Sequence, residues 1–154
     1  MIEENKKSDS LITLFETKKS LTITLLRARE SLMMSFRPLL AKHNFTEQQW
    51  RVLRVLGEKG PCDAGQLATE ACILSPSLSR IINTLIENNF IIKKEDKLDK
   101  RKIILEISDE GKLKLETIKP EYMTILKSIQ KRYGEDKINK ILDLLTEVIE
   151  WRSR

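Results

Sequence analysis

The spacing of apolar residues predicts helices over most of the chain. From Ser20 onward, apolar side chains recur every three or four residues, the period of one face of an α-helix. That face carries Leu21, Leu25, Leu26, Met33, Phe36 and Leu40. We expect a first helix over residues 20–42, kinked at Pro38 because proline removes one helix hydrogen bond. The polar segment before it, residues 1–19, is predicted to be a flexible arm.

Capping signals mark the start of the next two helices. Thr46 and Gln49, three residues apart, are the residue types of a capping box, so a second helix is expected to run from there to about Glu58. Asp63 and Gln66 repeat the same spacing and predict a short third helix.

A fourth helix is predicted to begin at Ser75 as N-cap, with Pro76 at the first helical position, and to end at Asn88 and Asn89. Its apolar stripe is expected to comprise Leu78, Ile81, Ile82, Leu85 and Ile86. The third and fourth helices then form a helix-turn-helix. Because their connecting turn is apolar, Cys72 within it is predicted to be a buried, inert thiol.

The pattern then changes to β-branched runs. Residues 90–92 and 103–107 flank a charged segment and predict a β-hairpin. Ser108 is expected to cap a long fifth helix, bent or interrupted near Pro120 and broken over residues 133–136. A last helix follows, whose apolar face comprises Ile138, Ile141, Leu142, Leu145, Val148 and Ile149. The predicted fold class is therefore mainly α with a small β-hairpin wing.

These elements are expected to form a single domain, residues 20–154. At its centre lies a winged helix-turn-helix over about residues 45–107, flanked by long helices over about residues 20–42 and 109–152. The terminal helices carry more apolar surface than a chain of this length can cover by itself, so we expect them to form a homodimer.

The exposed face of the fourth helix is a candidate DNA-binding surface. At ~100° per residue, Arg80 points away from the apolar stripe, and small polar side chains flank it. The predicted contacts are Ser75, Ser77, Ser79, Arg80, Asn83 and Thr84. Such a set suits a helix in the major groove, where arginine reads guanine. The alternative is an ordinary solvated face, although Glu87 is the only acid near it.

The hairpin turn is a second candidate. Residues 93–102 contain six basic side chains against three acids, as expected of a wing that reaches the DNA backbone and minor groove. Lys97, Asp99 and Arg101 are the predicted contacts, with the Asp99 carboxylate orienting the Arg101 guanidinium. A solubilising loop is the alternative interpretation.

Composition narrows the class of function. The 28 basic and 23 acidic residues give a net charge of +5, which suits an acidic partner such as DNA. With one histidine, two cysteines, no G-x-G-x-x-G motif and no P-loop, the sequence predicts no catalytic residue, metal site or cofactor. No apolar run approaches the ~20 residues of a membrane span, and no signal peptide is recognisable, so a cytoplasmic protein is expected.

Several strings of residues resemble a known family. Asp99-Lys100-Arg101, an apolar strand and Ser108-Asp109-Glu110-Gly111 are similar to the wing signature of the MarR family of winged-helix transcription regulators. Longer strings resemble its homoprotocatechuate-degradation operon regulator subgroup: Ala28-Arg29-Glu30, Met33, Phe36-Arg37-Pro38, Thr46-Glu47-Gln48-Gln49-Trp50-Arg51 and Ala71-Cys72-Ile73-Leu74. The recognition helix departs from the subgroup over residues 75–80, so its operator is expected to differ.

The resemblance implies a homodimer that represses a promoter by binding double-stranded operator DNA. A small aromatic acid such as 4-hydroxyphenylacetate would release it, and the genes controlled would serve aromatic-acid catabolism. A carboxylate needs a cation near an apolar wall. The residues predicted to supply both are Arg27, Arg29, Met33, Arg37, His43 and Trp50. The alternative is that Trp50 belongs to the core and that the arginines pair across the dimer.

Two other functions stay open at this point. One is a MarR-type regulator of efflux or stress genes whose effector is a fatty acid or an oxidant, the latter acting on Cys62 or Cys72. The other is a helical protein-interaction module. The salt dependence of binding distinguishes this module from a DNA-binding protein, because DNA binding weakens steeply as the salt concentration rises.

Overall fold

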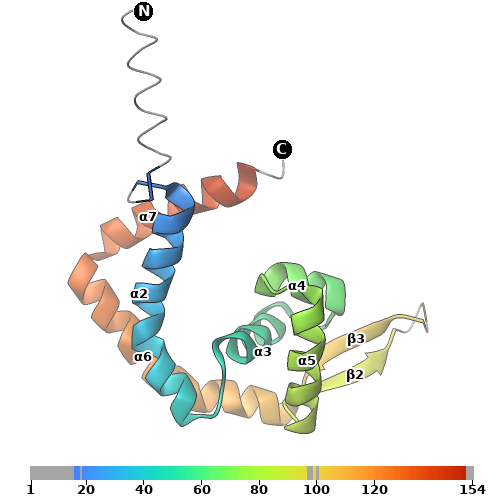
Figure 1. Ribbon diagram of the computed structural model, residues 1–154. Helices are drawn as coiled ribbons and strands as arrows, with labels where there is room; N and C mark the ends of the chain where they lie inside the picture. Colours follow the sequence, from blue (N-terminus) through green and yellow to red (C-terminus); the bar gives the residue numbers. More distant parts are fainter. Residues whose placement is uncertain (1–15, 18, 97–98, 100, 152–154) are drawn as a thin grey trace, which may run out of the picture. The chain divides into compact units, whose positions relative to one another are not determined.

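The computed structural model describes residues 16–17, 19–96, 99 and 101–151 (Figure 1). It consists of two compact units, residues 1–38 and 39–154, and each is described by itself. In chain order the elements are α2 (Leu21–Lys42), α3 (Glu47–Lys59), β1 (Cys62–Asp63), α4 (Ala64–Ala71), α5 (Ser75–Glu87), β2 (Ile91–Glu95), β3 (Ile103–Ile107), α6 (Asp109–Tyr133) and α7 (Glu135–Glu150). The mainly helical class with a small sheet is confirmed. Most of the predicted arm lies outside the described residues.

The predicted caps of α3 and α4 are confirmed. The Thr46 hydroxyl accepts a hydrogen bond from Gln49 N at 3.2 Å, and the Gln49 side chain accepts in return from Thr46 N at 2.9 Å. At α4, Gln66 N donates to the Asp63 carboxylate at 2.9 Å. Each box satisfies N–H groups that the first turn of a helix leaves unpaired, so both helix starts are set by residues within three positions.

The predicted start of α5 is wrong by one residue. Leu74 is the N-cap: its backbone is extended (φ −65°, ψ 137°), and its side chain makes no capping hydrogen bond. Ser75 is therefore already helical, and Pro76 lies in the first turn, where a missing N–H leaves no helix bond unmade. The N–H groups of Ser77 and Leu78 bond to Leu74 O, each at 3.0 Å.

The wing is a three-stranded antiparallel sheet in the order β1-β3-β2, where the sequence predicts only a two-stranded hairpin. The additional strand β1 pairs Cys62 with Leu105 and Asp63 with Ile104. Two residues are too few to show an alternating pattern, which is why β1 leaves no trace in the sequence.

The junction of the wing with α6 is closely packed. Ser108 Oγ accepts from Gly111 N at 2.9 Å, as the predicted cap requires, and donates to Asn89 O at 2.5 Å. A Cβ at Gly111 would lie 2.2 Å from Phe90 O, so only glycine permits this approach. These contacts fix the base of the sheet to the first turn of α6.

The core of the second unit lies where α3, α4, α5, the sheet and α6 meet. Its fully buried side chains include Val52, Leu53, Leu56, Leu67, Leu78, Leu85, Ile91, Leu105 and Ile118.

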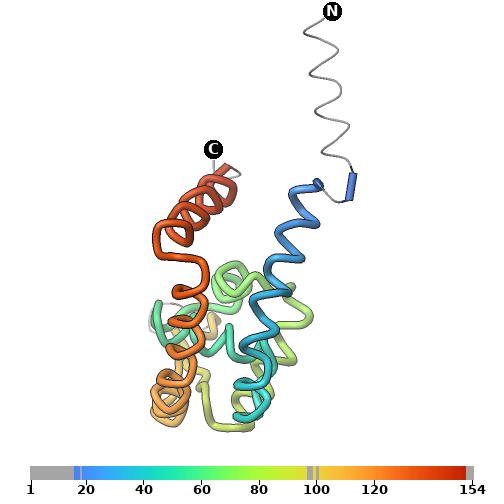
Figure 2. Tube along the Cα trace, turned by 90° about the vertical axis from the view of Figure 1, so that its left-hand side faces the viewer, coloured from blue at the N-terminus to red at the C-terminus, as the bar shows by residue number. Residues whose placement is uncertain are grey.

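α2 and α6 run without interruption through Pro38 and Pro120, and the ribbon of α6 bends along its course (Figure 1). After Gly134 the chain enters α7 (Figure 2), none of whose residues is buried. No helix in the described part of the chain has the length and apolarity to cross a membrane.

Candidate DNA interface and effector site

α5 presents the polar face that the sequence predicts. Its buried residues are Leu78, Ile81, Ile82 and Leu85. Its exposed residues include Ser75, Ser77, Ser79, Arg80 and Asn83. Ile86, expected in the buried stripe, is only half-buried because it lies at the edge of that stripe. Figure 1 shows the β2–β3 hairpin extending beside α5, so one end of this unit carries both predicted DNA-binding elements.

Two hydroxyl groups on α5 bond to the backbone of the helix itself. Ser79 Oγ donates to Ser75 O at 3.3 Å, and Thr84 Oγ1 donates to Arg80 O at 3.2 Å. With their hydrogens engaged, these hydroxyls can serve another molecule only as acceptors. Thr84 is also half-buried, at the edge of the face. Arg80, the only cation in α5, is therefore its main donor to an anionic partner.

The wing tip holds Arg101 in the predicted pairing. One Asp99 carboxylate oxygen accepts from Arg101 N at 3.0 Å and from Arg101 Nε at 3.3 Å. Asp99 N donates in turn to the Asp96 carboxylate at 2.9 Å. The Arg101 side chain is 93% exposed, so Asp99 orients its guanidinium without covering it. Lys97, the third residue predicted here, lies outside the described residues.

The predicted ligand residues fall in both units. Four lie on α2 in the first unit: Arg27, Arg29, Met33 and Arg37. Glu30 in the same helix pairs with Arg29 at 2.7 Å and also with Arg37. The structure thus brings Arg29 and Arg37 together on one acid. His43 and Trp50 lie in the second unit.

Trp50 is part of an aromatic cluster, formed with Tyr122 and Arg54, that is not among the predictions from the sequence. The residue is 6% exposed, as its alternative interpretation as a core residue requires, yet its Nε1–H has no acceptor among the described residues. The Trp50 and Tyr122 rings lie 5.7 Å apart. The Arg54 guanidinium lies 5.2 Å from the centre of the Tyr122 ring and donates to the Tyr122 hydroxyl at 3.1 Å. The unpaired Trp50 N–H, the rings of Trp50 and Tyr122 and the Arg54 guanidinium therefore form one cluster.

The other two residues of this cluster, Arg54 and Tyr122, differ in whether the sequence could have predicted them. Arg54 follows Trp50 by one turn of the same helix, a spacing that sequence reasoning could have used. Tyr122 comes from α6, far along the chain, and no local pattern connects it to Trp50.

Next to Tyr122 in the chain, Glu121 is contacted by the side chains of Lys42 and His43. Lys42 Nζ lies 2.8 Å and His43 Nε2 3.4 Å from its carboxylate. The hydrogen bond from Lys42, and after it the one from His43, holds the pKa of Glu121 below its ordinary value. His43 therefore already has a carboxylate neighbour within the chain.

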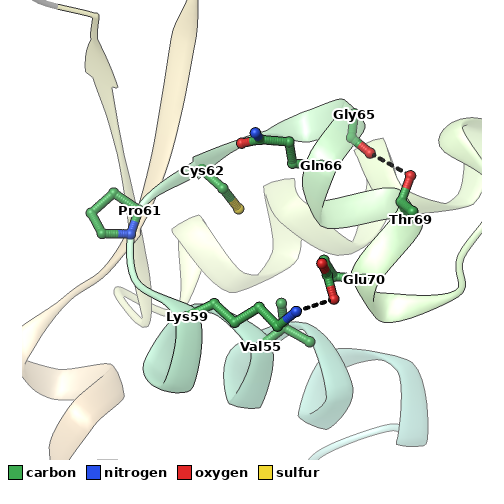
Figure 3. Close-up of a pocket in the computed structure, with 8 residues that line it drawn as sticks. All are labelled: Val55, Lys59, Pro61, Cys62, Gly65, Gln66, Thr69 and Glu70. Atoms are coloured by element: carbon green, nitrogen blue, oxygen red, sulfur yellow. Dashed lines mark hydrogen bonds and ion pairs between the residues drawn. The ribbon is translucent and has the colours of Figure 1, made fainter. Parts of the chain in front are cut away.

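The two cysteines differ in exposure, and the prediction that Cys72 is buried is wrong. Cys72 is exposed: its backbone is left-handed (φ 50°, ψ 52°), and the following Ile73 takes the buried position instead. Cys62 lines a pocket of about 550 Å³ formed by α3, β1 and α4 (Figure 3). Burial, and after it Asp63 and Glu70, raises the pKa of the Cys62 thiol, which makes it a poor nucleophile.

Comparison with known proteins identifies the architecture. A sequence model of the MarR family matches residues 45–103, which span the helix-turn-helix and most of the wing. The chain is 38% identical over 129 residues to the HTH-type transcriptional regulator FarR of Neisseria gonorrhoeae, which covers 84% of this chain and 88% of FarR. The chain belongs to the MarR family.

Two further MarR-type relatives are similar over most of their length. The homoprotocatechuate degradative operon repressor of Escherichia coli is 35% identical, over 84% of this chain and 88% of the repressor. NadR, solved in complex with 4-hydroxyphenylacetate, matches with a TM-score of 0.76 and 38% identity, over 84% of this chain and 92% of NadR. The predicted family is confirmed, and this MarR-family protein is a DNA-binding transcription regulator rather than an enzyme.

Proposed function

We propose that this MarR-family protein is a dimeric repressor that releases its operator when a small aromatic carboxylic acid binds beside Trp50. The observation that carries the proposal is the buried Trp50 Nε1–H, which has no acceptor among the described residues. Leaving a buried donor unpaired costs about 1–3 kcal/mol. A ligand oxygen that accepts this hydrogen recovers that cost, so the cluster favours a ligand with an acceptor at this point.

The rest of the cluster specifies the chemistry of the ligand. The rings of Trp50 and Tyr122 supply a wall for an aromatic group, and Arg54 supplies a positive charge for a carboxylate. Only one Arg54 contact, to the Tyr122 hydroxyl, uses its donors within this cluster, and a guanidinium has five. The complex of the relative NadR with 4-hydroxyphenylacetate supports the same class of ligand here.

A second copy of this chain is the proposed occupant of the apolar face of α7. Large apolar side chains exposed at this end of the chain are Ile141, Leu142, Leu144, Val148, Ile149 and Trp151. Two recognition helices ~34–36 Å apart can enter successive major grooves of one operator, which a single copy cannot do. The DNA contacts proposed for each copy are Arg80, Ser75, Ser77 and Asn83 on α5 and Arg101 on the wing, with Asp99 orienting Arg101.

Release requires that the acid bind one conformation of the repressor better than the other. α3 carries both Trp50 and Arg54 and packs against α4 and α5. A shift of α3 on ligand binding therefore passes directly to the recognition helix.

Ligand binding is tested through the fluorescence of Trp50. The chain has two tryptophans, and Trp151→Phe leaves Trp50 as the only one. Titration of this variant with 4-hydroxyphenylacetate should change its fluorescence, and the neutral amide of the same acid should not. Arg54→Gln should weaken binding at least tenfold, because it removes the charge that faces the carboxylate. Arg132→Gln, at the exposed end of α6, is the matched control.

Release is tested on a duplex selected by the wild-type protein from a random-sequence pool. Fluorescence anisotropy should show that 4-hydroxyphenylacetate displaces the protein from this duplex. Recovery of no sequence preference, together with weak dependence on salt, would contradict the repressor assignment. If a fatty acid or peroxide displaces the protein and 4-hydroxyphenylacetate does not, the protein is still a repressor, but its effector is not an aromatic acid.

A further inference from the structure

Arg51 on α3 reaches the turn between α4 and α5. Its Nη1 donates to Ala71 O at 2.8 Å and to Cys72 O at 3.3 Å. Arg51 is half-buried and forms no ion pair with any described residue. Its guanidinium is thus committed to two backbone carbonyls at the C-terminal end of α4.

These carbonyls belong to a turn with an uncommon backbone. Cys72 N donates to Thr69 O and Ile73 N to Ala68 O, the pair of bonds that defines a Schellman motif. The left-handed position of this motif is usually glycine, but here it is Cys72 at φ 50°. A residue with a side chain stays in that region only where its surroundings hold it there.

Arg51 restrains this turn through its hydrogen bonds to Ala71 O and Cys72 O. The two bonds of the Schellman motif satisfy carbonyls deeper in α4 and leave the last carbonyls of the turn unpaired. A guanidinium is suited to these carbonyls, because the C-terminal end of a helix attracts positive charge. α5 begins at Ser75, three residues after Cys72, so the same contacts set where the recognition helix starts.

We propose that Arg51 is a positioning residue for operator recognition: it clamps the α4–α5 turn and thereby fixes the placement of α5. This inference rests on the proposed reading of operator DNA by α5. Loss of the clamp should loosen the turn while leaving the charges on the DNA-binding face in place. Specific binding should then suffer more than non-specific binding, which depends on charge alone.

The test compares Arg51→Met with Arg51→Lys and with Lys59→Met as a matched control. Lys59 also reaches from α3 to α4, through an ion pair with Glu70 at 2.5 Å, but it does not contact the turn. Lys59→Met therefore removes the same charge from the same helix. Each variant is titrated against the duplex selected by the wild-type protein and against a scrambled duplex.

Arg51→Met should weaken binding to the selected duplex about tenfold and leave the scrambled duplex within about twofold of the control, a difference of about 1.4 kcal/mol. Arg51→Lys should lose less, because an ammonium group can reach one of the two carbonyls. Amide hydrogen exchange over residues 72–75 should accelerate in Arg51→Met and not in Lys59→Met. Binding of 4-hydroxyphenylacetate to the free protein should be unchanged, since Trp50, Arg54 and Tyr122 remain.

Equal losses on both duplexes would overturn the proposal, because Arg51 would then act as a phosphate contact. Wild-type affinity of Arg51→Met for both duplexes would overturn it as well. If Arg51→Met does not fold, Arg51→Lys decides: a reduced preference for the selected duplex supports the clamp, and an unchanged preference overturns it. Failure of the wild-type protein to select any duplex is a failure of the proposed function instead, and it appears before any variant is made.

Discussion

α5 and α7 carry equally regular apolar stripes but bury them in different ways. α5 has four buried apolar residues, and its opposite face is polar with a single cation. α7 has a stripe of the same period and no buried residue. Helical period therefore identifies an apolar face in both helices, but it does not say whether that face packs within one chain or against another molecule.

The difference assigns separate tasks to the two helices. α5 is fixed by its own chain, so its polar face is available to DNA. α7 leaves its apolar face exposed, and under the proposed function a second copy covers that face and sets how far apart two α5 helices lie. On this account, changes in the stripe of α5 affect the folding of each chain, whereas changes in the stripe of α7 affect only the dimer.

The largest effect on stability is expected from truncation of the α5 stripe. Leu85 is 1% exposed, and Leu85→Ala should lower the free energy of unfolding by about 2–5 kcal/mol through the cavity that it leaves. Leu142, on α7, is 55% exposed, and Leu142→Ala should destabilise the protein only through the dimer. Urea unfolding at several protein concentrations separates the two cases, since only dimer loss depends on concentration. A loss for Leu142→Ala as large and as concentration-independent as that for Leu85→Ala would break the distinction.

Charges placed on the α7 stripe should separate the dimer. Leu142→Asp combined with Ile149→Asp is expected to yield a folded monomer whose affinity for the selected duplex falls about 100-fold or more, because two linked half-site contacts become one. Sedimentation and anisotropy measure the two effects. Lys140→Asp, on the opposite face of α7, is the control and should remain dimeric. A monomeric double variant with wild-type affinity for DNA would refute the role given to α7.

Smaller losses are expected from the two arginines proposed to contact DNA. Arg80→Ala should cost about 1–3 kcal/mol of binding free energy and relax the sequence preference, because it removes a base contact. Arg101→Ala should weaken binding more evenly across sequences, because the contacts proposed for the wing are to phosphates and the minor groove. Titrations on selected and scrambled duplexes compare them, and neither change should alter sedimentation. An Arg80→Ala protein with unchanged affinity and preference would remove α5 from the interface.

The smallest effect is expected at Glu121, which lies on neither α5 nor α7. Its pKa is lowered in the folded protein by Lys42 and His43, so its ionised form favours folding at neutral pH. That contribution is complete above the ordinary carboxyl pKa and disappears as pH falls through the lowered folded value. Glu121→Gln should therefore melt slightly earlier than the wild type at pH 7 and together with it in strong acid. An identical difference at every pH would show that ionisation of Glu121 is not involved.

The parts of the structure that follow from the sequence are those set by near neighbours. The caps at Thr46 and Asp63 each depend on a residue three positions away, and Asp99 lies two residues from Arg101. The polar face of α5 follows from helical period alone. Local signals of this kind act before any long-range contact forms, which explains why they are predictable.

The parts of the structure that the sequence does not predict depend on a left-handed backbone conformation or on contacts between residues far apart in the chain. The exposure of Cys72 results from a left-handed backbone that an apolar neighbourhood does not reveal. β1 exists only because β3 pairs with it. Trp50 of α3 meets Tyr122 of α6, and Arg51 of α3 meets Ala71 at the end of α4. Nothing in the residues adjacent to either member of such a pair indicates the other.

Calorimetry shows whether an aromatic acid and operator DNA favour different states of this regulator. 4-Hydroxyphenylacetate is titrated into the free protein and into the protein saturated with its selected duplex. We expect at least tenfold weaker binding to the DNA-bound protein, because the two ligands must be coupled reciprocally by about 1.4 kcal/mol or more. Equal affinity in the two titrations would contradict this expectation.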